Sequence, residues 1–369
     1  MIIRELRAES WRNLDPVVIR PSAGLTVLSG RNGQGKTNLI EAIYFLATLR
    51  SWRTSRAREL VRAPAATGDR ARLAALIEGS GLVRRVEVGV AAGSRTASLD
   101  GKVVRGAAAI FGALSVVLFV PEDLMLPRAA PGARRKYLDL AVFNVERGFY
   151  KEASAFQRVL KSRNALLRTG RTPALLVDTY DEELARTEAR VVMRRRAMVA
   201  DLRPRMASVF MRLHGDLEVD LRYRSHARVE AGGDEDQVRG ALLAGLAGHR
   251  SLDEARRYTG FGPQTDDVEI VLSGRLAREH ASQGQLRSLV LALKLAELSN
   301  VEERRGEAPV LLLDDVPSEL DPERRRFLFD MIGSLSCQTV ISVADRDVVP
   351  PLPGRKDYVV DRGRADASS

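Results

Sequence analysis

A chain of 369 residues is long enough for two or three domains with buried cores. Its 45% hydrophobic and 29% charged residues are typical of a globular protein, and its single cysteine, Cys337, excludes an internal disulfide and indicates a reducing compartment. No apolar run approaches the roughly 18 residues of a membrane-spanning helix, which excludes a membrane transporter with its spans in this chain. The net charge of +10 indicates an anionic macromolecular partner, but a generally arginine-rich proteome would explain it equally well.

The first 48 residues predict a phosphate-binding loop. Residues 1–29 favour three strands, and the third, at 25–28, leads into Gly30-Arg31-Asn32-Gly33-Gln34-Gly35-Lys36-Thr37. Helical spacing of apolar residues follows at 39–47. A glycine-rich turn between a strand and a helix allows backbone N–H groups and the helix N-terminus to surround a phosphate. In this pattern Lys36 reaches the β- and γ-oxygens of a nucleotide and the Thr37 hydroxyl binds Mg²⁺.

The middle of the chain predicts first strands and then long helices. Residues 72–105 alternate apolar and polar side chains, with a hairpin turn at Asp100-Gly101, and residues 115–120 favour a buried strand. From residue 131 the pattern becomes helical. We predict helices at 132–143, 146–168, 174–212 and 235–257, and a strand at 217–221. The tail at 362–369 is expected to fray.

Residues 309–315 predict the second half of a nucleotide site. This apolar run favours a buried parallel strand, and it ends in Asp314 and Asp315. Ligands bind at the carboxyl ends of such strands, so Asp314 is the candidate Mg²⁺ ligand and Asp315 the candidate water-positioning group. Taken alone, the pair would more often be a turn at a strand end. With a phosphate loop in the same chain, the nucleotide site is favoured.

A segment before this strand predicts another element of ABC-type ATPases. Ser282-Gln283-Gly284-Gln285 precedes a predicted helix at 286–299. Ser282 could simply cap that helix. However, S-x-G-Q at a helix start, shortly before an L-L-L-D-D strand, is the signature arrangement of these ATPases, and Ser318-Glu319-Leu320-Asp321 follows in the place of their D-loop.

Together these motifs resemble the RecF family of recombination mediators, within the SMC-like branch of ABC-type ATPases. The resemblance covers nearly the whole chain. Further motifs that carry it are Arg12-Asn13-Leu14, Glu41-Ala42, Pro121-Glu122-Asp123-Leu124, Pro131 with Arg134-Arg135 and Leu138-Asp139, Asn164-Ala165-Leu166-Leu167, and Gly262-Pro263 with Asp266-Asp267. There are departures: Gln264-Thr265 replaces the usual His-Arg, and Ser342-Val343-Ala344-Asp345 replaces a threonine-rich strand. The replacement of His-Arg leaves open that the chain is a diverged paralogue in which ATP binding and DNA binding are coupled differently.

The resemblance implies an α/β fold, an ABC-type (SMC-like) P-loop ATPase head with an inserted α-helical lobe. We predict head segments at 1–130 and 257–369 and the lobe at 131–256. The predicted nucleotide-binding residues are Arg12, Asn13, Gly30, Arg31, Asn32, Gly33, Gln34, Gly35, Lys36, Thr37, Asn38, Ser282, Gly284 and Gln285. The predicted catalytic residues are Lys36, Asp314, Asp315 and Ser282, with Thr37 and Asp314 on Mg²⁺. The candidates for DNA contact are Arg134, Arg135, Arg194 and Arg195.

The function implied by the resemblance is ATP-dependent binding to gapped or junction DNA, within DNA repair, DNA replication and the SOS response. Such a protein dimerises on ATP, hydrolyses it weakly under stimulation by DNA, and with RecO and RecR helps to load RecA. It would be cytoplasmic and nucleoid-associated, without a membrane partner. ABC-type ATPases usually have Glu after the metal-binding Asp, whereas this chain has Asp315. Two alternatives remain open: an ATPase subunit acting on something other than DNA, and an ATP-binding clamp that does not hydrolyse.

Overall fold

The computed structural model describes residues 1–62, 70–91, 94–104, 110, 112–171, 173–215, 217–227 and 233–368. The chain divides into two compact units: unit 1 is Met1–Leu124 with Lys294–Ser369, and unit 2 is Met125–Leu293. Unit 2 extends beyond the lobe predicted at 131–256, because β10 (Asp267–Leu272) pairs with β9 (Val219–Arg224) and therefore belongs to the same unit. Within the described ranges, no helix is both long enough and apolar enough to cross a bilayer.

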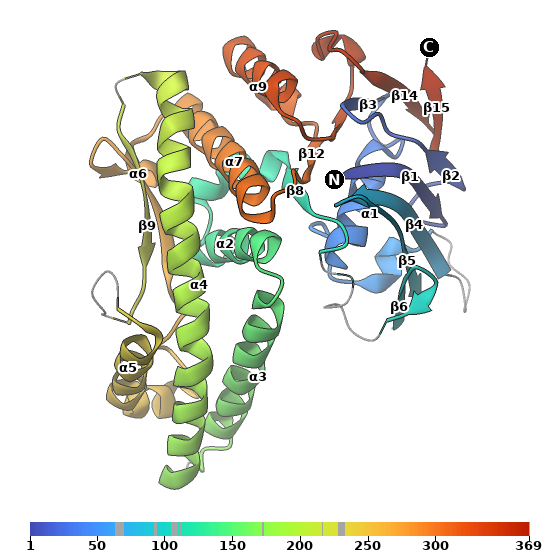
Figure 1. The fold of residues 1–369 in the computed structure, drawn as a ribbon. Helices are drawn as coiled ribbons and strands as arrows, with labels where there is room; N and C mark the ends of the chain where they lie inside the picture. The colour runs from blue at the N-terminus through green and yellow to red at the C-terminus, as the bar shows by residue number, and fades with distance from the viewer. Residues whose placement is uncertain are drawn as a thin grey trace. The chain divides into compact units, whose positions relative to one another are not determined.

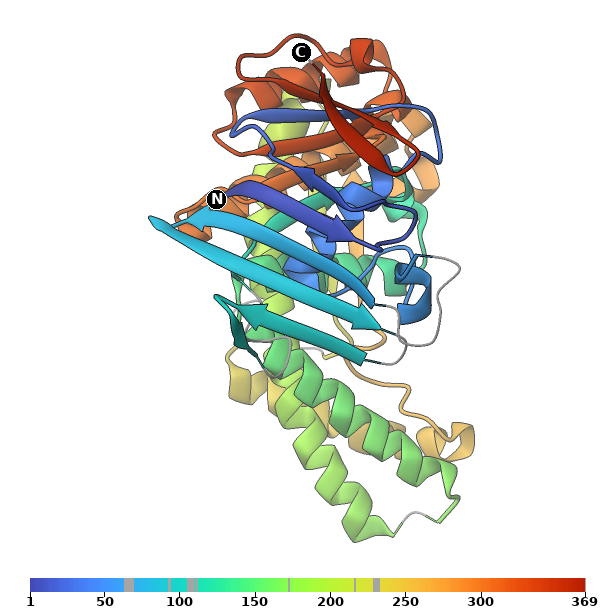
Figure 2. The same ribbon diagram turned by 90° about the vertical axis from the view of Figure 1, so that its right-hand side faces the viewer.

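The first sheet of unit 1 is antiparallel, with the strand order β2-β1-β4-β5-β6-β7 (Figure 2). Its strands are β1 (Ile2–Glu9), β2 (Val17–Ile19), β4 (Arg70–Gly79), β5 (Leu82–Ala91), β6 (Ser94–Leu99) and β7 (Lys102–Val103). Buried and more exposed residues alternate along β4 and in the second half of β5, as the period-two pattern predicts. Asp100 and Gly101 connect β6 to β7 with φ values of 51° and 77°, as in a type I′ turn. The predicted hairpin is confirmed.

The second sheet of unit 1 is mainly parallel, with the strand order β15-β14-β3-β13-β12-β8. Its strands are β3 (Leu25–Ser29), β8 (Val116–Phe119), β12 (Val310–Asp314), β13 (Thr339–Val343), β14 (Lys356–Asp361) and β15 (Arg364–Ser368). All residues of β3, β12 and β13 are buried. Because these three strands are parallel neighbours, their carboxyl ends meet at one edge of the sheet.

Helix α1 (Lys36–Thr48) contacts strands of both sheets, and its apolar residues belong to the main core of unit 1 (Figure 1). Eleven of its side chains are buried, which is why its sequence is apolar nearly all round. The remaining helical segments of unit 1 are η1 (Ala57–Leu60), α8 (Val316–Glu319), α9 (Pro322–Ser334) and η4 (Arg346–Val348). The divisions between the units fall inside η3 (Pro121–Arg128) and α7 (Gln283–Arg305).

Residues 356–368 form a hairpin, so the predicted fraying is wrong for 362–368, and Ser369 lies outside the described residues. β15 pairs antiparallel with β14, and Arg362 and Gly363 form the connecting turn with φ values of 47° and 81°. The turn contacts the phosphate loop. The Arg362 N–H donates to Gln34 Oε1 at 2.6 Å, and the Gly363 N–H donates to Gln34 O at 2.9 Å. These two hydrogen bonds fix the turn between β14 and β15 to the phosphate loop.

Unit 2 is mainly helical. The predicted helices at 146–168 and 174–212 are α3 (Phe149–Arg168) and α4 (Ala174–His214), which pack together as an antiparallel pair (Figure 1). The predicted strand at 217–221 is β9, which pairs with β10, and β10 pairs in turn with β11 (Arg275–Leu276). The other helices are α2 (Pro131–Val145), α5 (Glu235–Arg256), α6 (Ala277–His280) and the first part of α7.

Buried ion pairs connect α3 to α4 and α5. Arg163 on α3 is fully buried. Its Nε donates to Asp181 Oδ1 on α4 at 2.7 Å, and its Nη1 donates to Asp253 Oδ2 on α5 at 2.7 Å. Because removing one partner would leave an uncompensated buried charge, these pairs fix the rotation of α3 about its axis.

Another buried acid of unit 2, Glu188 on α4, has no hydrogen-bond partner for either carboxyl oxygen among the described residues. Burial, reinforced by the charge of Asp266, raises the pKa of Glu188 well above its usual value, and Arg163 opposes this shift. A raised folded-state pKa favours folding at acid pH, and this contribution is lost as the pH rises toward the folded value.

We therefore expect Glu188→Gln to raise the free energy of unfolding by about 1–3 kcal/mol near pH 8, where the parent must either keep a proton or bury a charge. Near pH 5 keeping the parent carboxyl protonated in the folded state costs less free energy, so the gain should shrink. Thermal unfolding of parent and variant at the two pH values measures this. A gain in stability that is equal at the two pH values would contradict a raised pKa of Glu188.

Candidate functional site

The phosphate loop, residues 30–37, runs from β3 to α1 as the sequence predicts. Two of its glycines have conformations and surroundings that exclude a side chain. Gly30 has φ 142°, and a Cβ there would lie 2.3 Å from Val360 O; Gly35 has φ 120°, and its Cβ would lie 2.8 Å from Leu14 Cδ2. The loop is therefore packed against β14 and the segment after β1, which leaves its other side facing a pocket.

Lys36 begins α1, and its side chain is largely buried beneath the loop. Its Nζ donates to Gly30 O at 2.5 Å and to Arg31 O at 3.0 Å. Burial lowers the pKa of the ammonium, while the charges of Asp315 and Asp314 oppose that shift. The positive charge thus lies in the curve of the loop, close to where a phosphate would be held.

Thr37 and Asp314 come together from opposite parts of the sequence. The Thr37 hydroxyl donates to Asp314 Oδ1 at 2.9 Å, and Ser342 Oγ at the end of β13 donates to the same oxygen at 2.6 Å. Burial raises the pKa of Asp314, and both hydrogen bonds oppose the shift. A hydroxyl and one carboxylate beside a phosphate loop fit Mg²⁺, which is usually bound by one or two carboxylates together with substrate phosphates.

Asp315 follows the strand in a left-handed conformation, with φ 53°. Its backbone N–H donates to Ser342 O at 3.1 Å, and its Oδ1 accepts from Ser318 Oγ at 2.8 Å. Ser318 belongs to the predicted D-loop. Asp321, at the end of that segment, caps α9 by accepting from the Arg324 N–H at 3.0 Å. The carboxylate of Asp315 is therefore oriented by a residue of the predicted D-loop.

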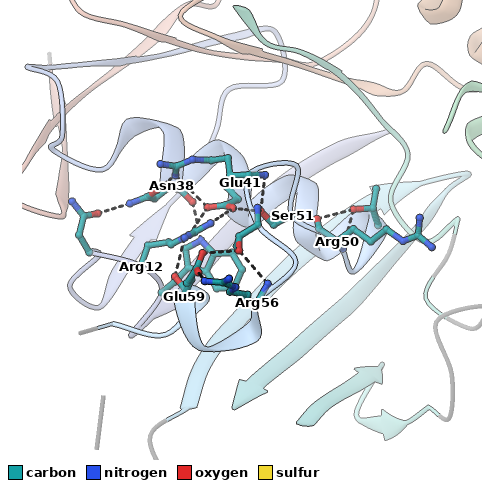
Figure 3. A network of polar contacts seen from close by, with 12 residues as sticks. Arg12, Asn38, Glu41, Arg50, Ser51, Arg56 and Glu59 are labelled. Carbon is teal, nitrogen blue, oxygen red and sulfur yellow. Dashed lines mark hydrogen bonds and ion pairs between the residues drawn. The ribbon is translucent and has the colours of Figure 1, made fainter. Parts of the chain in front are cut away.

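Arg12 is fixed by a buried carboxylate (Figure 3). Glu41 on α1 is fully buried and accepts from Arg12 Nε at 2.8 Å and from Arg12 Nη2 at 2.6 Å. Arg12 Nη1 donates to Glu59 O at 2.9 Å. Asn13 donates to Gly33 O at 2.8 Å and accepts from Asn38 at 2.6 Å, so the segment after β1 is tied both to the loop and to α1.

Arg12 is the main partner of the buried Glu41, although Arg53 Nη1 also lies 3.5 Å from the same carboxylate. Arg12→Gln is therefore expected to lower the free energy of unfolding by about 2 kcal/mol. Adding Glu41→Gln should recover much of that loss, since the poorly compensated charge is then gone. The matched control is Arg364→Gln, which breaks the exposed pair of Arg364 with Asp15 and should cost about 1 kcal/mol or less. Urea unfolding of the parent, Arg12→Gln, Glu41→Gln and the double variant measures the cycle, with Arg364→Gln beside it as the control. A double variant whose loss equals the sum of the two single losses would contradict the coupling.

These elements line one pocket of about 860 Å³ in unit 1. Nine of the predicted nucleotide-site and metal residues line it: Arg12, Asn13, Asn32, Gly33, Gly35, Lys36, Thr37, Asn38 and Asp314; Asp315 lines it as well. Gly30, Arg31 and Gln34 do not. Gly30 packs against Val360 and Gln34 accepts from the terminal hairpin, so both hold the loop in place.

The predicted signature residues belong to unit 2, at the start of α7. Ser282 Oγ accepts from the Gln285 N–H at 3.2 Å, while Gln285 Oε1 accepts from the Ser282 N–H at 2.9 Å. This reciprocal pair is a capping box. The capping role that the sequence allows for Ser282 is thus present. Ser282 is also exposed, and its hydroxyl proton is not needed for the cap.

The arginines predicted to contact DNA are largely engaged within unit 2. Arg134 is buried and paired with Asp267 at 2.7 Å, and Arg195 is buried and paired with Asp139 at 2.7 Å. Arg135 donates to Asp266 O at 2.6 Å, and Arg194 pairs with Glu146 at 2.6 Å. Burial and pairing correct the prediction for Arg134 and Arg195, because a buried, neutralised guanidinium cannot reach a phosphate backbone.

Sequence reasoning missed several residues of the pocket. Ser342 hydrogen-bonds to Asp314, and Arg53 Nη1 donates to Asn38 Oδ1 at 2.7 Å. Trp52, Arg62 and Glu122 also line the pocket. Ser342 could have been found from its place at the carboxyl end of a buried strand, and Glu122 from the motif Pro121-Glu122-Asp123-Leu124. Arg53 and Trp52 lie in an irregular segment whose path no local pattern indicates.

Known proteins with this arrangement match the chain over most of its length. The family described as RecF/RecN/SMC N terminal domain matches residues 2–351. The DNA replication and repair protein RecF of Anaeromyxobacter dehalogenans (strain 2CP-C) is 45% identical over 359 residues, which cover 96% of this chain and 95% of the relative. The protein of the same name from Myxococcus xanthus is 42% identical, with 95% and 92% covered.

Solved structures agree with these relatives. The recombination mediator protein RecF with ATP, from the RecFOR pathway, has a TM-score of 0.91 and 29% identity, with 100% of this chain and 98% of that chain covered. An Smc head domain from Pyrococcus furiosus has a TM-score of 0.57 at 16% identity, covers 100% of this chain and 96% of its own, and shares the fold alone. The chain therefore belongs to the RecF family, and its fold is that of an ABC-type, SMC-like ATPase head with an inserted helical lobe.

Proposed function

We propose that this chain is an ATP-dependent DNA-binding protein of recombinational repair, in which ATP acts as a switch. The observation that carries the proposal is the hydrogen bond between Thr37 and Asp314, which joins the phosphate loop to the strand-end acids inside one pocket. A relative that is 45% identical is named a DNA replication and repair protein, and the net charge of +10 suits a polyanionic partner.

In this proposal the residues of the pocket have separate tasks. Lys36 and the N–H groups of residues 33–37 bind the phosphates, and Thr37 with Asp314 would hold Mg²⁺, which supplies charge neutralisation at the β- and γ-oxygens. Asp315, oriented by Ser318, would position the attacking water. Arg12 and Asn13, which also line the pocket, would contact the nucleotide.

The proposed partners follow from the family. They are gapped or junction DNA, a second copy of this chain when ATP is bound, and RecR, RecO and RecA. Cytoplasmic, nucleoid-associated localisation and a role in the SOS response complete the proposal.

DNA binding is tested by the mobility of labelled gapped duplex at several salt concentrations, with and without ATP. We expect ATP to strengthen binding and added salt to weaken it steeply, because phosphate contacts release counterions. If the protein binds ATP but shows no affinity for DNA at low salt, the proposal of a DNA partner is wrong.

ATP turnover is expected to be slow and stimulated by DNA. Asp315 is one methylene shorter than the glutamate that ABC-type ATPases usually have there, and a misplacement of about 1 Å can cost roughly a hundredfold in rate. Phosphate release should therefore rise in Asp315→Glu and fall further in Asp315→Asn. A parent that turns over as fast as a motor enzyme would contradict the idea of a switch.

A further inference from the structure

Helix α3 in unit 2 exposes a face that carries positive charge and no negative charge. Its exposed residues are Lys151, Gln157, Arg158, Lys161, Ala165 and Arg168. At about 100° per residue, all six fall within an arc of about 120°. The four cations extend about 26 Å along the helix axis, at about 1.5 Å per residue. We call Lys151, Arg158, Lys161 and Arg168 the α3 stripe.

The α3 stripe brings four cations that are not neutralised onto one face of one helix. Among the residues that the structure describes, no carboxylate pairs with any of the four. The helix contains one acid, Glu152, and this accepts from Arg194 on α4 at 3.2 Å. Several exposed arginines elsewhere in the unit are paired, as in Arg186 with Glu183 and Arg190 with Glu235. Other exposed arginines have no ion pair among the described residues, but they lie on separate segments: Arg171, Arg256, Arg257 and Arg275.

The buried side of α3 explains why this face points to solvent. Arg163, paired with Asp181 and Asp253, lies about 180° around the helix from the middle of the stripe. The apolar residues Phe156, Leu160 and Leu167 are buried on the same side as Arg163. The ion pairs and the apolar contacts therefore hold the rotation of the helix that exposes the four cations.

We propose that the α3 stripe binds the phosphate backbone of DNA. This inference rests on the proposed DNA-binding function and names the surface that the predicted arginines do not supply. A phosphate backbone is favoured over an acidic protein segment because α3 has no exposed large apolar side chain, and a protein interface ordinarily has an apolar centre. Backbone contacts need only positive charge along a line.

The test compares two variants that each lose four positive charges. The stripe variant is Lys151→Gln/Arg158→Gln/Lys161→Gln/Arg168→Gln. The matched control is Arg186→Gln/Arg190→Gln/Arg222→Gln/Arg239→Gln, which removes exposed arginines of the same unit that are paired with acids. Fluorescence anisotropy of a labelled, gapped duplex is measured between about 50 and 200 mM salt, with ATP present. Circular dichroism and ATP binding check that each variant is folded.

For the stripe variant we expect the slope of log affinity against log salt to become shallower by about 3–4, since each phosphate contact contributes about 0.9. Affinity at the lowest salt should fall by about tenfold or more, whereas the control should change little. Two half variants keep the test valid if the fourfold variant is unstable: Lys151→Gln/Arg158→Gln and Lys161→Gln/Arg168→Gln. In each of them the slope should become shallower by about half as much as in the fourfold variant.

Three results would overturn the inference. If the parent binds DNA and the stripe variant keeps the parental slope, the DNA surface lies elsewhere and the proposed function stands. If the folded parent binds ATP but no DNA, both the inference and the proposed function fail. If a poly-glutamate peptide binds the parent more tightly than the duplex does, and the stripe variant loses that binding, the occupant is an acidic protein segment.

Discussion

Lys36→Ala is expected to lose ATP affinity by about a hundredfold while the fold survives. A charge-assisted hydrogen bond is worth about 1.5–3 kcal/mol, and a lysine of the phosphate loop makes more than one such bond to the β- and γ-oxygens. The folded structure, by contrast, should lose little stability when this side chain is removed. Its Nζ contacts two carbonyl oxygens of its own loop, and its lowered pKa shows that burial already disfavours the charge.

Lys356→Ala is the matched control for this substitution. Lys356 is also in unit 1, and its Nζ also donates to a backbone carbonyl, that of Arg20 at 2.8 Å, but it does not line the pocket. Isothermal titration with ATP should therefore separate the two alanine variants, and thermal unfolding should show both folded. Equal ATP affinity in parent and Lys36→Ala would mean that the loop is not the nucleotide site.

The phosphate loop and the strand-end acids could be predicted from sequence because each is a local pattern with a compact physical cause. The glycines of residues 30–35 allow backbone conformations that other residues disfavour, and the run at 309–313 is apolar because both faces of β12 are buried. Their meeting in space also follows, since parallel strands bring their carboxyl ends to one edge. The hydrogen bond between Thr37 and Asp314 is the outcome.

The terminal hairpin could not be predicted in the same way. A two-residue type I′ turn usually contains Asn-Gly or Asp-Gly, whereas this turn is Arg362-Gly363, followed by the polar run Arg-Ala-Asp-Ala-Ser. β15 has little apolar surface of its own. It is stabilised by the ladder with β14 and by the bonds of the turn to Gln34, which lies more than three hundred residues earlier in the chain.

The arginines of unit 2 also show what a sequence cannot reveal about a binding surface. Sequence alone could not distinguish Arg134 and Arg195, each buried against an aspartate, from Arg158 and Arg168, which are exposed without one. The partners Asp267 and Asp139 are distant in sequence, so only the tertiary structure separates a structural cation from an available one. The density of arginine on α4 therefore does not indicate how many of its cations are available to a partner.

Ser282→Arg is expected to abolish an ATP-dependent dimer while leaving ATP binding by the single chain nearly unchanged. Ser282 is exposed at the N-terminus of α7, a helix of 23 residues whose positive end and exposed hydroxyl suit an anion. In ABC-type heads the signature completes the site of a partner across a two-fold axis. The pocket described above is lined by unit 1 residues without Ser282, so its own ATP affinity should persist.

The bulk of the arginine side chain should prevent the two chains from closing on ATP at that interface. An arginine at position 282 would occupy the space of the partner's γ-phosphate, and loss of the cap bond to the Gln285 N–H would cost only about 1 kcal/mol. Ser282→Thr keeps the hydroxyl cap and should dimerise normally, which separates the interface from helix stability. Sedimentation velocity of the parent and both variants with a slowly hydrolysed ATP analogue measures whether each one dimerises. A parent that stays monomeric at saturating nucleotide, or a Ser282→Arg variant that dimerises like the parent, would show that Ser282 only caps its helix.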